Sequence, residues 1–79
     1  MNRNEIIEKV NRLLTEELEI ESDLIRPEAS LKDDLEIDSL DFVDVVVLIN
    51  DEFGFRPSTE DMKKIKTVDD FYNFVEAHV

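Results

Sequence analysis

The sequence of 79 residues has no cysteine and no tryptophan, and it holds one glycine, two prolines and one histidine. The absence of cysteine excludes a disulfide scaffold, a thiolate zinc site and a cysteine nucleophile. The longest apolar run, residues 45–49, is far shorter than the ~20 residues that span a bilayer, so we expect no membrane span. This length allows one domain, which we expect to cover residues 1–79.

Basic residues are also scarce. Nine lysines and arginines stand against 21 aspartates and glutamates, which gives a formal net charge of −12. Such a surface repels nucleic-acid phosphates, so we expect no nucleic-acid partner. It favours basic patches on other proteins instead. The first residues hold no apolar stretch typical of a secretory signal, and we expect a monomer in the cytoplasm.

Residues 38–53 are predicted to form the second of four helices. Asp38, with Asp41 three positions later, is typical of a helix start, and Gly54 is typical of a helix end. The β-branched residues of this segment also suit a buried strand, but the sequence offers no second strand for it to pair with. As a helix, the segment has one apolar stripe, formed by Phe42, Val46, Ile49 and Phe53.

The spacing of the other apolar residues predicts three more helices and one long loop. The first helix covers residues 4–18, and two shorter helices begin at Ser58 and Thr67. Residues 19–37 contain a proline that rules out a long helix, yet they are too apolar for a free linker, so we expect a loop pinned to the core. The fold class is therefore all-α: a four-helix bundle with a long loop between helices 1 and 2 and a short third helix.

Patterns typical of catalysis and metal binding are nearly absent. The single histidine, His78, is the penultimate residue, and we expect it to fray into solvent. Ser39 has no general base near it in the sequence, so it should not act as a nucleophile unaided. The acidic residues around it lack the spacing of an EF-hand. We therefore expect no catalytic residue, no metal site and no enzymatic activity.

Ser39 is notable for its place at the start of a helix. If Asp38 is the N-cap, a phosphate ester on the Ser39 hydroxyl would lie beside unpaired backbone N–H groups and the positive end of the helix dipole. The position therefore suits a serine that carries a phosphodiester. The alternative is an ordinary serine in a first helical turn that Asp38 caps.

Acidic residues are concentrated around this serine. Between Asp33 and Glu52 lie eight acidic residues and no basic residue. On a helical wheel, Leu40 and Val47 lie opposite the apolar stripe, among Asp41, Asp44 and Asp51. An apolar pair inside an acidic ring is typical of a small docking patch, with apolar contacts for affinity and charges for steering. A solvated helix face with isolated exposed apolar side chains is the alternative.

These residues resemble those of the acyl carrier protein family. Asp38-Ser39-Leu40 is similar to the Asp-Ser-Leu at which that family receives 4′-phosphopantetheine from coenzyme A. Residues 31–35 resemble the lead-in to this motif, and later landmarks of the family match at residues 51–53 and 64–68. The resemblance covers essentially the whole chain.

The resemblance implies specific roles for particular residues. It makes Ser39 the attachment point for the prosthetic group, with Asp38 as the flanking helix cap. It implies partner recognition by five residues of the second helix: Leu40, Asp41, Asp44, Val47 and Asp51. It also implies an acyl cavity between the helices, with Val46, Ile49 and Phe71 as its candidate lining.

The function that the resemblance implies is that of a carrier. Acyl intermediates would be held as thioesters on the arm and presented to fatty-acid, polyketide or related biosynthetic enzymes. The implied partners are a phosphopantetheinyl transferase and acyl-transfer and synthase enzymes with basic docking patches. Glu36 departs from the family, which often has glycine there, so a specialised carrier of a polyketide, lipid or nonribosomal pathway stays open beside the housekeeping one. A small acidic helical interaction module without a prosthetic group is the alternative from another class.

Overall fold

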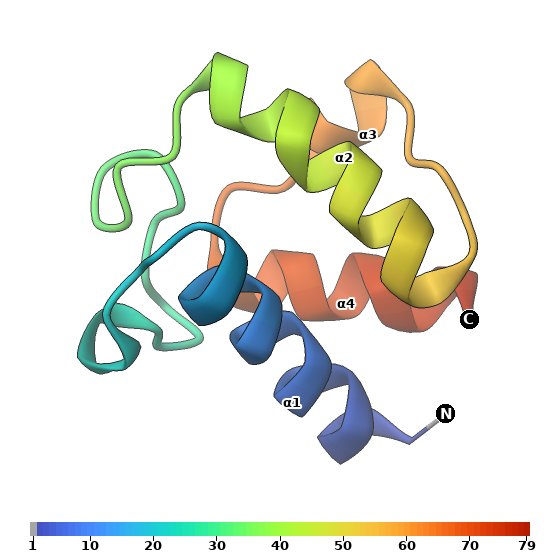
Figure 1. Ribbon diagram of the computed structural model, residues 1–79, viewed down its shortest axis with the longest axis horizontal. Coiled ribbons are helices and arrows are strands. Elements are labelled where there is room, and N and C mark those ends of the chain that lie inside the picture. The colour runs from blue at the N-terminus through green and yellow to red at the C-terminus, as the bar shows by residue number, and fades with distance from the viewer. Residues whose placement is uncertain (1) are drawn as a thin grey trace.

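The computed structural model describes residues 2–79, and these residues form a bundle of helices without a named strand (Figure 1). The α-helices are α1 (Arg3–Arg12), α2 (Ser39–Phe53), α3 (Thr59–Lys64) and α4 (Val68–His78). Two short helical segments lie between the first two: the π-helical turn η1 (Leu13–Glu17) and the 3₁₀ turn η2 (Ser22–Leu24). The all-α prediction of four helices, with a long connection after the first and a short third helix, is confirmed.

The helix starts follow from local capping. In α2, the side chain of Asp38 accepts from the backbone of Asp41, and the side chain of Asp41 accepts from the backbone of Asp38. The same reciprocal box begins α3 with Ser58 and α4 with Thr67. A capping box satisfies N–H groups that a helix start otherwise leaves unpaired. The three predicted helix starts are therefore confirmed.

The first helix differs from its prediction at its C-terminal end. We expected one α-helix to Leu18, but the last turn widens into the π-helical η1. Glu19 then takes a left-handed conformation with φ of 56°, and the Ile20 amide donates to the Leu14 carbonyl oxygen over 3.1 Å. A left-handed residue that folds the chain back onto the last carbonyls is a common way to end a helix.

The long crossover of residues 19–37 is pinned to the core, as predicted. Its buried side chains are Ala29, Leu31, Leu35 and Ile37. Backbone bonds tie it to the segment before α4: the Leu31 amide donates to the Lys66 carbonyl oxygen over 2.9 Å, and the Val68 amide donates to the Ala29 carbonyl oxygen over 3.0 Å. One apolar side chain of the crossover, Leu24, remains exposed instead.

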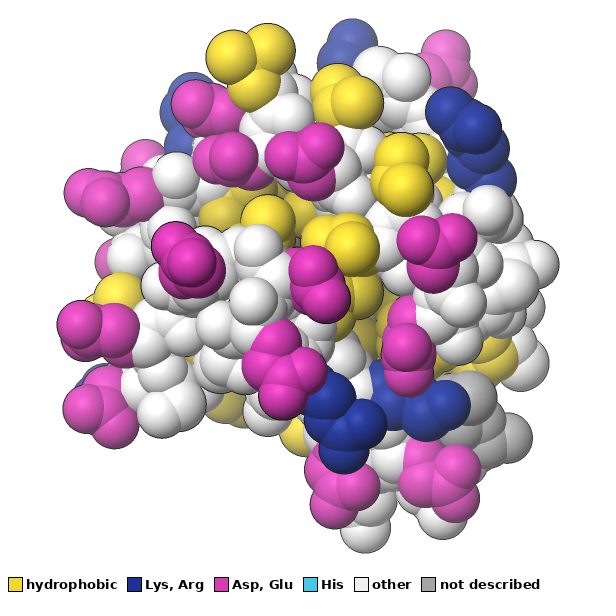
Figure 2. Space-filling model, viewed as in Figure 1, with side chains coloured by type: hydrophobic (Ala, Val, Ile, Leu, Met, Phe, Trp, Pro, Cys, Tyr) yellow, Lys and Arg dark blue, Asp and Glu magenta, His cyan; other side chains and the backbone are white. Residues whose placement is uncertain are grey.

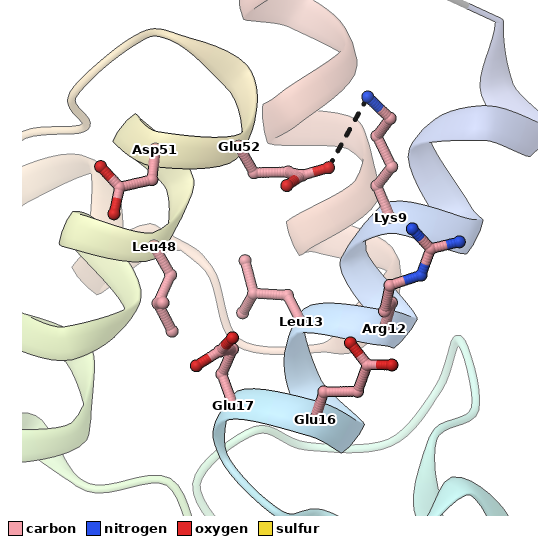
Figure 3. Close-up of a pocket in the computed structure, with 8 residues that line it drawn as sticks. All are labelled: Lys9, Arg12, Leu13, Glu16, Glu17, Leu48, Asp51 and Glu52. Atoms are coloured by element: carbon pink, nitrogen blue, oxygen red, sulfur yellow. Dashed lines mark ion pairs between the residues drawn. The ribbon is translucent and has the colours of Figure 1, made fainter.

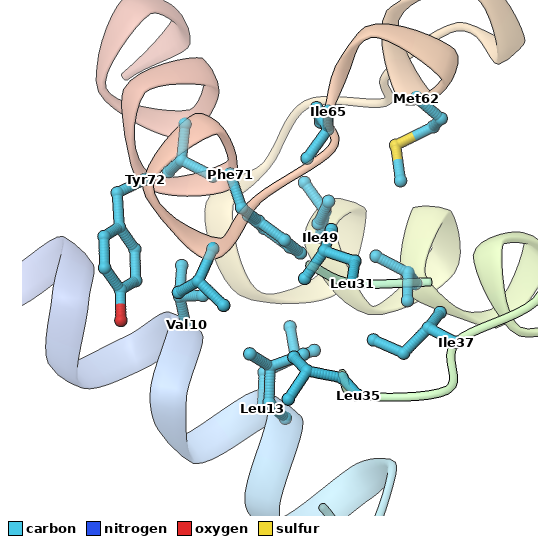
Figure 4. Packing of buried hydrophobic residues seen from close by; sticks show 14 of the residues in the cluster. Val10, Leu13, Leu31, Leu35, Ile37, Ile49, Met62, Ile65, Phe71 and Tyr72 are labelled. Atoms are coloured by element: carbon cyan, nitrogen blue, oxygen red, sulfur yellow. The ribbon is translucent and has the colours of Figure 1, made fainter. Parts of the chain in front are cut away.

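The core lies where α1, α2, α4 and the crossover meet (Figure 4). From α2 it takes Val45 and Ile49, both fully buried, whereas Phe42, Val46 and Phe53 are only half-buried. The prediction for this apolar stripe is therefore wrong in one respect: the buried face of α2 is centred on Val45 and Ile49, not on Phe42 and Val46. Phe42 packs against the edge of the core and also lines a surface groove described below.

Helices α1 and α4 are joined by side-chain bonds as well as by packing. Arg3 forms ion pairs with Asp69 over 3.0 Å and with Glu76 over 2.9 Å. The Tyr72 hydroxyl donates to Asn11 Oδ1 over 2.5 Å, and burial raises the pKa of this phenol above its usual value. These contacts connect the two ends of the chain, which lie on the same side of the molecule in Figure 1.

Among residues 2–79, no helix is long and apolar enough to cross a membrane.

Candidate functional site

Ser39 is the first residue of α2, and its side chain is exposed. Asp38 Oδ1 accepts from the backbone amides of Leu40 over 2.9 Å and Asp41 over 3.0 Å, while Asp41 Oδ2 accepts from the Asp38 amide over 3.2 Å. The cap fixes the backbone on both sides of Ser39. Within residues 2–79 the Ser39 hydroxyl has no hydrogen-bond partner, so it is free for chemistry at a rigid position.

The capping geometry corrects one expectation about this site. We expected unpaired N–H groups at the start of α2, available to a phosphate. The structure instead pairs the Leu40 and Asp41 amides with the Asp38 carboxylate. That carboxylate also offsets the positive end of the helix dipole. Of the first three amides of α2, only that of Ser39 has no acceptor within residues 2–79, so a phosphodiester on Ser39 finds one free amide rather than three.

A groove of about 500 Å³ opens beside Ser39, between α2 and α3. Its lining residues are Lys32, Ile37, Asp38, Ser39, Phe42, Thr59, Met62 and Lys63. A second hollow of about 300 Å³ shares four of these residues, Lys32, Phe42, Met62 and Lys63, and extends to Lys66. Because they share walls, the two hollows adjoin and lead away from Ser39 along α3.

The residues predicted to line an acyl cavity are elsewhere. Ile49 and Phe71 are fully buried in the core, Val46 is half-buried, and none of the three lines either hollow. Sequence reasoning missed Phe42 and Met62 as groove residues. Phe42 could have been found from the sequence, because it follows Ser39 by about one helical turn and therefore lies near it on the surface of the helix.

The predicted docking face of α2 is apolar and exposed. Leu40 is 77% exposed and Val47 is 48% exposed, as the helical wheel predicted. Val43, which is 63% exposed, joins them on the same face and was missed, although the same wheel places it there. Asp44 is exposed beside them. Figure 2 shows apolar atoms at the top of the view, where α2 begins, with carboxylates around them.

The two remaining acidic residues predicted to recognise partners are placed differently. Asp41 is half-buried and is used in the cap of α2. Asp51 is exposed and lines a hollow of about 170 Å³ between α1 and α2 (Figure 3). In that hollow Leu13 and Leu48 point toward one another, and Lys9 pairs with Glu52 over 3.6 Å. Asp51 lies on the same stripe of α2 as Leu40 and Val47, whereas Asp41 lies at the edge of that stripe.

His78 is more ordered than predicted. It ends α4 rather than fraying, and its Nδ1 lies 2.8 Å from the Phe74 carbonyl oxygen. The imidazole stacks on the ring of Phe55, with 5.0 Å between the ring centroids. The expectation of a free terminal histidine is wrong because aromatic side chains from two segments hold the ring.

Comparison with known proteins identifies the family. A family model described as the phosphopantetheine attachment site matches residues 8–75. The acyl carrier protein of Thermosynechococcus vestitus is 38% identical over all 79 residues, a match that covers 98% of that protein. The chain belongs to the acyl carrier protein family. A solved structure of the acyl carrier protein from Enterococcus faecalis has a TM-score of 0.80 and 33% identity, with each chain covered in full.

Membership in the acyl carrier protein family confirms the central predictions from sequence. The protein is a carrier and not an enzyme, and its prosthetic group is 4′-phosphopantetheine. Its partners are the transferase and synthase enzymes that acyl carrier proteins serve. The four-helix architecture agrees with that of the family.

Proposed function

We propose that Ser39 carries the 4′-phosphopantetheine arm. The observation that supports this most strongly is the Ser39 hydroxyl itself, exposed at the first residue of α2, without a hydrogen-bond partner among residues 2–79 and beside the 500 Å³ groove. These residues fit the group, because a covalent arm needs an accessible oxygen at a fixed position and an adjoining surface to lie on. The arm supplies the thiol that forms acyl thioesters, in a chain that has no cysteine.

Loading with coenzyme A tests this site. The apo protein is incubated with coenzyme A and a phosphopantetheinyl transferase, and its intact mass is measured. We expect a gain of one arm in the wild type and in Ser22→Ala, a matched control at another exposed serine, and no gain in Ser39→Ala. A gain in Ser39→Ala would place the arm elsewhere. No gain in the wild type would favour the alternative of an interaction module without a prosthetic group.

We also propose that the outer face of α2 binds the partner enzymes. Three exposed apolar side chains, Leu40, Val43 and Val47, lie on one helix face, and the exposed carboxylate of Asp44 flanks them. Scattered apolar residues are normal on a surface, whereas a contiguous patch favours a contact site. An acidic border attracts a basic partner from a distance, so the face suits the transferase and synthases with basic docking patches.

Charge reversal on this face separates docking from folding. Asp44→Lys should leave stability within about 0.5 kcal/mol of wild type, because the side chain is exposed. It should slow association with the transferase at low salt, and the effect should shrink at high salt. Leu40→Ala and Val47→Ala should act through faster dissociation. Stopped-flow binding distinguishes these effects.

Glu8→Lys is the matched control for charge, since Glu8 is an exposed residue of α1. It changes the net charge by the same amount without touching α2. If Asp44→Lys and Glu8→Lys slow association equally, only the net charge steers the partner, and the docking role of α2 fails.

We infer that residues 1–79 act as one monomeric carrier domain in the cytoplasm and deliver acyl groups to fatty-acid, polyketide or related synthases. Light scattering on the loaded protein checks the monomer. Mass analysis of thioesters recovered from the native host identifies the cargo.

A further inference from the structure

The two adjoining hollows between α2 and α3 collect positive charge in an otherwise acidic protein. Three of the nine basic residues line them: Lys32, Lys63 and Lys66. Only two carboxylates, those of Asp33 and Asp38, lie in the same lining, and Asp38 is used in the cap of α2. In a chain of net charge −12, a surface with more cations than anions is a local reversal of sign.

The ammonium groups of these lysines are uncommitted. Among residues 2–79, ion pairs of basic side chains are made only by Arg3 and Lys9. The backbone beneath them is held: the Lys66 amide donates to Asp70 Oδ2 over 3.2 Å, and the Lys66 carbonyl oxygen accepts from Leu31. The lysines are thus free donors on a fixed frame.

Helix electrostatics accounts for only part of this arrangement. Lys63 and Lys64 both lie in the last turn of α3, where a cation is favourable to the helix dipole. Lys64 has this role without lining either hollow. Lys66 directly follows the C-cap of α3, whereas Lys32 lies in the crossover, outside any helix. The helix dipole therefore does not account for Lys32.

The groove floor is apolar, which limits what could lie there. Phe42 and Met62 line both hollows, Ile37 lines the part beside Ser39, and Leu31 and Ile65 line the part farther along. An apolar floor suits the methylene chain of an acyl group attached through Ser39. The lysines above it suit an anion at the end of that chain, since exposed ammonium groups pair with carboxylates.

We propose that the groove receives acyl groups that end in a carboxylate. This inference rests on the proposed attachment at Ser39. The carboxylate of a short acyl group pairs with Lys32 or Lys63, which line both hollows. The carboxylate of a longer acyl group reaches Lys66, which lines the second hollow but not the groove beside Ser39.

A pair of cargoes of equal length tests the proposal. The apo protein is loaded by the transferase from hexanoyl-coenzyme A or adipoyl-coenzyme A, six-carbon groups that differ in the terminal carboxylate. Cleavage of each thioester by hydroxylamine is measured and divided by the rate for the same thioester on free pantetheine. We expect adipoyl to be protected roughly two- to fivefold more than hexanoyl, the range that an exposed ion pair supports.

Three lysine variants, each removing one positive charge, test the role of the groove, and Lys64→Gln is the control among them. Lys32→Gln and Lys63→Gln should lower the protection of adipoyl without changing that of hexanoyl, and Lys64→Gln should change neither. Amide NMR shifts of Met62 and Ile65 should differ between the two cargoes in the wild type. Urea unfolding of the apo variants checks that each is folded.

Each other outcome overturns the inference. Equal protection of the two cargoes, or stronger protection of hexanoyl, shows that the groove does not select a carboxylate. An equal loss in Lys64→Gln shows that net charge, and not the groove, is responsible. A loaded protein without a preference leaves the proposed function intact, whereas a protein that takes no arm on Ser39 overturns the proposed function and this inference with it.

Discussion

The side of the molecule formed by α1 and α4 is built differently from the side formed by α2 and α3. Arg3 ties α1 to α4 through Asp69 and Glu76, and Tyr72 and Asn11 add a further bond. Among residues 2–79, no side-chain hydrogen bond or ion pair joins α2 to α3. These two helices face each other across the groove beside Ser39 instead.

The difference shows how a small domain can combine stability with access. A chain of this length buries only roughly 60% of its unfolded surface, so it has few contacts to give up. The described structure concentrates its cross-links between the terminal helices. The helix pair that borders Ser39 is left without them, and regions with few such contacts are those that open most easily.

The largest expected effect comes from truncating one aromatic side chain on each side of the molecule. Phe71→Ala should lower the free energy of unfolding by roughly 3–5 kcal/mol, because the ring is fully buried in the core. Phe42→Ala should cost clearly less, because that ring is half-buried over the groove. Urea unfolding measures both, and Phe71→Leu replaces Phe71→Ala if the latter does not fold. Equal costs for Phe42→Ala and Phe71→Ala would contradict the distinction between the two sides.

Gly54 is the next test, because it controls how α2 ends and the chain turns toward α3. Its φ of 79° is left-handed, and a Cβ built there meets no atom within 4 Å. Gly54→Ala should therefore cost about 1–2 kcal/mol through backbone strain alone. Gly54→Asn should cost less, since asparagine tolerates this conformation. Thermal unfolding that ranks the two variants equally would refute the explanation by strain.

A smaller effect is expected at the other end of α2. Glu36 has a φ of 57°, which is uncommon for glutamate, and it stands where the family often has glycine. Glu36→Asn should raise the free energy of unfolding by up to about 1 kcal/mol by relieving strain. Glu28→Asn is a control at an exposed crossover residue without a positive φ. A gain at both positions would point to reduced negative charge rather than strain.

The smallest expected effect is the response of α3 to acid. Hydrogen bonds from the Ser58 side chain and backbone lower the pKa of Asp61 below its usual 3.8. Because the folded pKa is the lower one, the stabilisation is present above pH 3.8 and is lost as the pH falls through the folded value. Amide NMR shifts of α3 should change in this window in the wild type but not in Asp61→Asn. If the amide shifts of α3 change with pH in Asp61→Asn as they do in the wild type, other carboxylates cause the change.

Much of the fold and part of the site could be predicted from sequence because they depend on short-range bonds. The caps at Asp38, Ser58 and Thr67 each close within three residues, so the pattern of residue types is sufficient. Gly54 ends α2 for a similarly local reason. The position of Ser39 at the start of α2 follows from the cap that precedes it, and the outward face of Leu40 and Val47 follows from the period of the apolar residues along the helix.

Other features were decided only when distant segments came together. Val45 rather than Phe42 enters the core because burial depends on which neighbours cover each side of α2. Aromatic rings from two segments order the terminal His78. The two adjoining hollows combine lysines from the crossover, from α3 and from the segment before α4, which no local pattern brings together. The sequence by itself determined where the helices begin and which serine stands at the start of α2, because those outcomes need only adjacent residues, while tertiary packing alone decided what surrounds that serine.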